Sequence, residues 1–91
     1  MEEVEARTVL HRRVTQLRQQ SYEQLRDAWL AHWDSEDYTG PSGVWYQVEI
    51  GALWDNKRAG HLRVVVSVDG EGRRGLTDSF IIAPDGSFIG E

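Results

Sequence analysis

The residues best able to do chemistry in this 91-residue chain are acidic, and they lie directly after Trp33. HWDSED, residues 32–37, places one imidazole and three carboxylates within six positions, and hard cations favour such oxygen-rich clusters. The spacing departs from a calcium loop, because Tyr38 stands at the fifth ligand position and Gly40 comes one position late for the sharp turn. We therefore expect no metal site and interpret the cluster as an acidic exit from a helix.

Two further patterns resemble functional motifs without the structural context that such motifs need. GEGRRG, residues 70–75, matches G-x-G-x-x-G, but LTDSFII behind it has the pattern of a strand and not of a phosphate-facing helix. We interpret it as a hairpin loop, with anion binding by its backbone and arginines as the alternative. Ser67 or Ser79 could act as a nucleophile only with a base such as His61 and an acid beside it. The sequence has no nucleophile elbow or other local motif that would support such a triad. The sequence thus predicts no catalytic residue and no cofactor.

The composition argues against several other classes of protein. The chain has no cysteine, which excludes disulfides and thiolate sites. Its formal net charge of −5 argues against nucleic-acid binding, because phosphate contacts need a basic surface. No run approaches the roughly eighteen apolar residues of a membrane span, and the acidic start MEEVEARTVLHRR has no signal-peptide core. These features predict one cytoplasmic domain, residues 1–91, that binds neither nucleic acid nor membrane.

The elements that position these residues begin with a helical segment in the first third of the chain. Ser21 is followed three residues later by Gln24, a capping-box pattern that predicts two helices, residues 3–19 and 21–33. The alternative is one long helix in which Ser21 is merely exposed. Apolar residues recur here at three- and four-residue intervals, as on the buried face of a helix: Leu10, Val14, Leu17, Leu25, Ala28 and Trp29.

From Val44 onward the apolar period changes to two, which predicts strands. VWYQVEIGALWD and HLRVVVSVD alternate clearly, and the loops DNKRAG, GEGRRG and PDG have hairpin length. We expect residues 34–43 to form a loop and the strands to pair antiparallel in sequence order. The helical segment should pack on one face of this four-stranded β-meander, which gives a two-layer α+β fold. The expected strands are residues 44–55, 61–69, 76–83 and 87–90.

The two faces of the expected sheet suggest two candidate sites. Tyr46 and Trp54 fall on the face assigned to the core, and with Tyr38 they form a candidate pocket between helices and sheet. Whether Trp33 joins them from the helical part stays open. The opposite face carries apolar residues whose number suggests a covered, interacting surface: Trp45, Leu53, Val65, Ile81 and Ile89.

Several stretches follow one another between Gly40 and Glu91: GPSG, YQVE, VSVD, LTDSFI and PDGSFIGE. In this order they resemble a family of small uncharacterised bacterial proteins with a domain of unknown function. The resemblance implies a free-standing cytoplasmic domain and implies no activity, substrate or catalytic residue. One departure is that members of the family carry aromatic residues between VDG and LTDSF, where this chain has the shorter GEGRRG.

Three functions follow from these observations as hypotheses. The favoured one is a non-enzymatic protein-interaction module or homodimer that acts through the outer sheet face. The alternatives are a small-molecule-binding protein or enzyme with a pocket between helices and sheet, and an immunity- or inhibitor-like protein whose acidic residues 34–37 meet a basic partner. Whether the N-terminal helix packs within its own chain or on another chain stays open.

Overall fold

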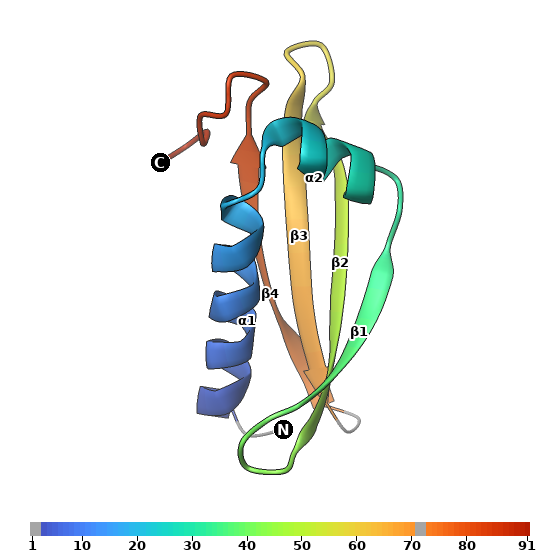
Figure 1. Ribbon diagram of the computed structural model, residues 1–91, viewed down its shortest axis with the longest axis vertical. Helices are drawn as coiled ribbons and strands as arrows, with labels where there is room; N and C mark the ends of the chain where they lie inside the picture. The colour runs from blue at the N-terminus through green and yellow to red at the C-terminus, as the bar shows by residue number, and fades with distance from the viewer. Residues whose placement is uncertain (1–2, 71–72) are drawn as a thin grey trace.

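The chain folds into two helices packed on one side of a four-stranded antiparallel sheet (Figure 1). The computed structural model describes residues 3–70 and 73–91. The helices are α1, Glu3–Arg18, and α2, Tyr22–Trp29; the strands are β1, Asp34–Thr39, β2, Trp45–Asn56, β3, His61–Gly70, and β4, Arg73–Ile82. The strands lie in the order β1-β2-β3-β4, so that the predicted α+β meander with helices on one face is confirmed.

Two helices form, and Ser21 begins the second of them. Its side chain accepts a hydrogen bond from Gln24 N–H at 3.1 Å, and Gln24 Oε1 accepts one from Ser21 N–H at 2.9 Å. This reciprocal pair satisfies N–H groups that a helix otherwise leaves free at its start. α1 then packs along β3 and β4, whereas α2 crosses the sheet at one end and packs on β2 (Figure 1). Neither helix of the described ranges has the length and apolar character needed to cross a bilayer.

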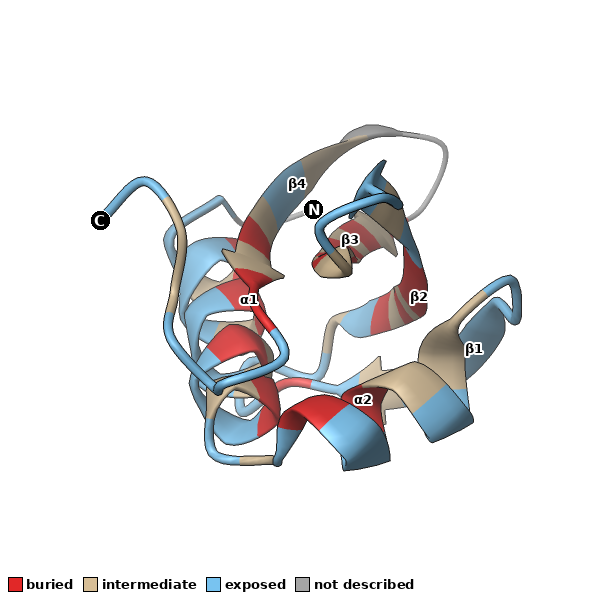
Figure 2. Cartoon of the chain, turned by 90° about the horizontal axis from the view of Figure 1, so that it is seen from above, coloured by how far each residue is buried: buried red, intermediate tan, exposed pale blue. Residues whose placement is uncertain are grey.

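The core lies between the two helices and the inner face of the sheet. Alternate residues of β2 and β3 point toward the helices, and Figure 2 shows buried residues on both helices and on β2, β3 and β4, with none on β1. The N-terminal helix therefore packs within its own chain. The core consists of Ala6, Leu10, Val14, Leu17, Tyr22, Leu25, Tyr46, Val48, Ile50, Ala52, Leu62, Val64, Val66, Val68, Phe80 and Ile82.

The expectation of a continuous loop over residues 34–43 is wrong, because Asp34–Thr39 forms the edge strand β1. β1 pairs with β2 from Asp34 opposite Ile50 to Thr39 opposite Trp45. All of its residues except Tyr38 are exposed, so an apolar alternation is neither needed nor present. Backbone pairing with β2 forms this strand, and charged side chains on a sheet edge also oppose pairing with other chains.

The expectation of a strand over residues 87–90 is also wrong, although the turn before it is present. Gly86 has φ +87°, and its N–H donates to the carbonyl oxygen of Ala83 at 2.9 Å. Beyond this turn the chain returns along β4 only as far as an isolated bridge between Phe88 and Ile82. Gly90 then adopts φ +82°, a left-handed conformation open to glycine, so this residue does not continue an extended strand.

The segment after this bridge is held to α1 by a side chain. Arg18 forms a two-pronged ion pair with Glu91, with 2.7 Å between Nη1 and Oε2. The Arg18 guanidinium carbon also lies 4.1 Å from the centre of the Phe88 ring. The hydrogen bonds between Arg18 and Glu91 lower the pKa of the carboxyl group and raise the pKa of the guanidinium. Ionic and ring contacts therefore replace sheet pairing at this end of the chain.

Candidate functional site

The outer face of the sheet, which points away from the helices, carries a row of apolar side chains. Leu53 of β2 lies opposite Arg63 of β3, and Arg63 lies opposite Ile81 of β4, so these three residues form one row across the outer face. Ile89 continues this row, because its N–H donates to the carbonyl oxygen of Ile81 at 2.9 Å. Val65 of β3 lies two residues from this row on the same face. Four of the five predicted interface residues therefore lie together.

Trp33 adds its indole ring to the same face and was not expected there. Ile50 and Ala52 point into the core, so the residue between them, Gly51, faces outward. A Cβ atom at Gly51 would lie only 2.2 Å from Cδ2 of Trp33, which means that the indole ring covers this glycine. Trp33 thus lies on the outer face and not in the core. We name the following five residues the outer apolar band: Trp33, Leu53, Val65, Ile81 and Ile89.

Arg63 crosses the band from β3, but its charge is compensated within the chain. Its Nη2 and Nε atoms donate to Asp55 Oδ1 at 2.8 and 3.2 Å, and its Nη1 atom donates to the Ser79 hydroxyl at 2.9 Å. A guanidinium held by several hydrogen bonds is fixed in orientation and presents its aliphatic stem to the surface. The band is therefore locally neutral.

Trp45, the fifth predicted interface residue, lies at the opposite end of the outer face. It is eight residues from Leu53 on the same strand, or about 26 Å at about 3.3 Å per residue. Its backbone pairs with Thr39 of β1, and the residue is 41% exposed. The structure does not bring Trp45 together with the other predicted interface residues.

A groove opens on the helical side of the sheet, between α1 and β1. Its larger hollow has a volume of about 520 Å³. A second hollow of about 290 Å³ continues it toward the start of α1, and both hollows share Val9, Arg12 and Tyr38. We name the two hollows together the helix–strand groove. The larger hollow is lined chiefly by Val9, Arg12 and Arg13 of α1, Glu36 and Tyr38 of β1, and Val48 of β2.

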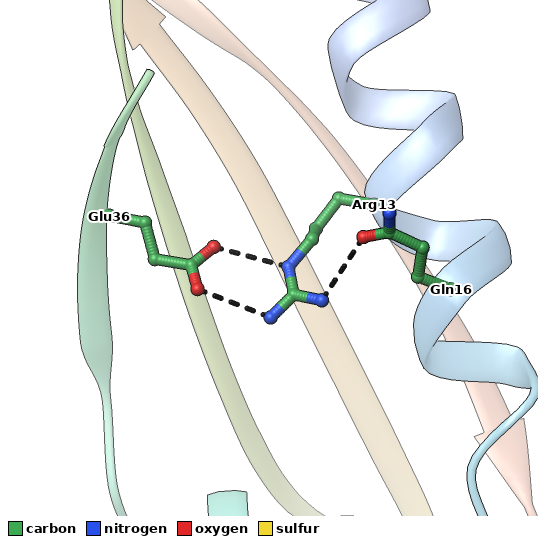
Figure 3. Close-up of polar contacts among 3 residues, drawn as sticks. All are labelled: Arg13, Gln16 and Glu36. Carbon is green, nitrogen blue, oxygen red and sulfur yellow. Dashed lines mark hydrogen bonds and ion pairs between the residues drawn. The ribbon is translucent and has the colours of Figure 1, made fainter.

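An ion pair joins the two walls of the helix–strand groove at one end (Figure 3). Arg13 Nε and Nη2 donate to the two carboxylate oxygens of Glu36 at 3.1 and 3.2 Å, and Arg13 Nη1 donates to Gln16 Oε1 at 3.2 Å. The two-pronged geometry orients the guanidinium toward β1. Because both side chains are partly exposed, the pair stabilises the fold by at most about 1 kcal/mol.

Glu5 joins α1 to the GPSG segment at the other end of the groove. Glu5 Oε1 accepts hydrogen bonds from the Ser42 hydroxyl at 2.6 Å and from the Tyr46 hydroxyl at 2.7 Å. Glu5 Oε2 accepts one from Ser42 N–H at 3.0 Å. The bond from the Ser42 hydroxyl, followed by that from Tyr46, lowers the pKa of Glu5. Gly40 leaves room for this contact, since a Cβ there would lie 2.3 Å from Glu5 Oε1.

The three residues of the predicted pocket occupy different environments. Tyr38 is partly buried and lines both hollows of the groove. Tyr46 is fully buried beneath the groove, where its hydroxyl reaches Glu5. Trp54 is partly buried against the core near the far end of β2 and lines neither hollow. Of the three, Tyr38 is the residue that lines the helix–strand groove.

The acidic cluster HWDSED is distributed along β1 and the turn before it. His32 Nε2 lies 3.5 Å from Asp34 Oδ2, while Glu36 points to the helical side and pairs with Arg13. Within residues 3–70 and 73–91, no three His, Asp or Glu side chains gather closely enough to hold a metal ion. The segment expected to meet a basic partner is therefore a strand whose central carboxylate is already paired.

The serines considered as nucleophiles make contacts that do not involve a histidine. The Ser67 hydroxyl lies 3.0 Å from that of Thr77, and the Ser79 hydroxyl accepts a hydrogen bond from Arg63. The loop GEGRRG includes residues 71–72, which lie outside the described residues. Its interpretations as a hairpin loop or as an anion site stay predictions.

Sequence reasoning missed Trp33 of the outer apolar band and the two arginines of the helix–strand groove, Arg12 and Arg13. Gly51 is the one available signal for Trp33, because a glycine inside an apolar strand often marks a close approach by another part of the chain. Arg12 and Arg13 gave no signal, since arginines between apolar helix positions also occur on any solvated face.

Comparison of the chain with models of protein families, with curated proteins and with solved structures finds no match. The resemblance of the segment from Gly40 to Glu91 to a family of small bacterial proteins stays a prediction.

Proposed function

We propose that the protein is a non-enzymatic interaction module that associates with a second copy of itself through the outer apolar band. The observation that supports this proposal is the exposure of Trp33 and Leu53, which are 53% and 44% accessible and lie on one face with three further apolar residues. Each large apolar side chain contributes roughly 1.5–3 kcal/mol when it becomes fully buried. A contiguous apolar surface of this kind commonly marks a protein contact.

The size of the outer face is compatible with a stable interface. β2, β3 and β4 have ten to twelve residues and β1 has six, so strands about 4.8 Å apart, with about 3.3 Å per residue, form a face about 19 Å wide and roughly 33 Å long. Its projected area of about 600 Å² approaches the roughly 800 Å² that each partner buries in a standard interface. A partner that covers this face would therefore bury an area near the lower end of standard interfaces.

The charge distribution favours a second copy as the partner. At a net charge of −5 two copies of the chain repel each other, so self-association requires a surface that is locally neutral. The outer apolar band meets this requirement, because Asp55 compensates Arg63 at its centre. A two-fold axis through the band would bring the same residues of both copies together, which is the usual form of a homodimer contact.

The test is the mass of the protein in solution, measured by light scattering over a concentration series. We expect a dimer for the natural sequence, and we expect Leu53→Glu to weaken it by about a hundredfold or more, because an unpaired carboxylate would be buried. Val4→Glu is the matched control: Val4 is 73% exposed on α1, on the other side of the sheet, so this variant should remain dimeric. Single-chain mass at every concentration, or equal effects of the two variants, would refute the proposal.

A further inference from the structure

We infer that the helix–strand groove binds a small organic monocarboxylate with an apolar body. The groove and the outer apolar band lie on opposite faces of the sheet, so this inference is independent of self-association. The larger hollow, at about 520 Å³, falls within the range of about 300–1,000 Å³ that is typical of small-molecule sites.

Arg12 supplies the charge that a carboxylate would meet. Its side chain lines both hollows, and no ion pair or hydrogen bond joins its guanidinium to another residue in the ranges that the structure describes. The neighbouring Arg13 is compensated by Glu36. Asp37 borders the groove, but alternation along β1 turns its side chain to the face opposite that of Glu36. Among the described residues of α1 that line the larger hollow, Arg12 therefore carries the positive charge without an ion-pair partner, and a planar guanidinium matches a carboxylate in two-pronged geometry.

The remaining lining residues provide the apolar contact. Val9 from α1 and Val48 from β2 present aliphatic surface, and the Tyr38 ring lies in both hollows. In the described part of the chain the Tyr38 hydroxyl has no hydrogen-bond partner, so it can donate to a second polar atom of the ligand. An apolar surface with a few convergent polar groups is the usual composition of a small-molecule site.

The two ends of the groove limit the size and charge of the ligand. At one end Glu5 of α1 is hydrogen-bonded to Ser42, and at the other end Arg13 of α1 is paired with Glu36 of β1. Glu5 and Arg13 are eight residues apart, or about 12 Å along the helix. Glu5 is a carboxylate whose pKa is lowered, so it is ionised at neutral pH and would repel a second negative group at that end. A compact monocarboxylate therefore fits this space better than a dicarboxylate.

The test uses 2-naphthoate as the probe and amide NMR shifts of the full chain as the readout. We expect saturable shifts centred on Val9, Tyr38 and Val48. The neutral analogue 2-naphthylmethanol and inorganic phosphate, which lack the charge and the apolar body respectively, should each bind at least about tenfold more weakly. Arg12→Gln should weaken naphthoate binding by about tenfold or more. Arg58→Gln removes another exposed arginine, which lies in the β2–β3 turn outside the groove, and should leave binding unchanged.

Several results would overturn the inference. One is the absence of saturable shifts at millimolar naphthoate. Another is shifts centred on Trp33 and Val65, which would place the probe on the outer apolar band. Equal weakening by the Arg12 and Arg58 variants would show attraction by overall charge, and phosphate binding as tight as naphthoate binding would remove the role of the apolar surface. The spectrum of each variant also reports whether it is folded.

Discussion

Truncation of two valines on α1 tests whether the flank of this helix toward β1 is open. Val14→Ala and Val9→Ala remove the same two methyl groups from the same helix, so the change in helix propensity is matched. Val14 is 7% exposed and belongs to the core, whereas Val9 is partly buried and lines the helix–strand groove. The difference between the two losses in stability therefore reports the packing around each side chain.

The structure sets the expected size of this difference. At about 0.8 kcal/mol per buried CH₂, two buried methyl groups correspond to about 1.6 kcal/mol. The cavity left at Val14 raises the loss to roughly 2–3 kcal/mol. Val9→Ala removes only partly buried methyl groups and leaves no enclosed cavity. The free energy of unfolding should therefore fall by less than about 1 kcal/mol. The difference of roughly 1–2 kcal/mol corresponds to about 4–16 °C in Tm for a domain of this size.

The assay is equilibrium unfolding in urea, followed by tryptophan fluorescence at one protein concentration for all variants, because self-association would add a concentration-dependent contribution. Equal m-values would show that both variants unfold between comparable states. If Val9→Ala destabilised the protein as much as Val14→Ala, the flank of α1 would be as tightly packed as its core face. The groove, and the binding inferred for it, would then be refuted.

Two further changes test local contacts. Ser21→Ala removes the capping box of α2 and should lower the free energy of unfolding by about 1 kcal/mol. Ser21→Asn can still cap the helix and should lower it much less. Equal losses for the two variants in urea unfolding would argue against the cap. Glu5 has a pKa lowered from its usual 4.5, chiefly by the Ser42 hydroxyl, so its contribution is present above the unfolded value and is lost as the pH falls through the folded value. Glu5→Gln should therefore reduce the loss of stability on acidification, as measured by urea unfolding at successive pH values, and an unchanged pH profile would contradict this assignment.

The sequence by itself determined the elements whose signals are local. The three- and four-residue apolar spacing around Leu10, Val14 and Leu17 reflects one helix face, and the period of two in β2 and β3 reflects one sheet face. The capping box at Ser21 and the turn at Gly86 are equally local, because their hydrogen bonds join residues only three positions apart. Such features can be predicted without knowledge of the rest of the chain.

Only the tertiary structure decided the features that join distant segments. β1 has no apolar pattern and exists because its backbone pairs with β2, so DSEDYT reads as a loop until its partner strand is known. The position of Trp33 depends on the space left by Gly51 on another element. The groove depends on the contact of Arg13 with Glu36, which are 23 residues apart. Spacing within a segment shows which side of that segment is buried, but the surface left open between two segments depends on how both pack on a third.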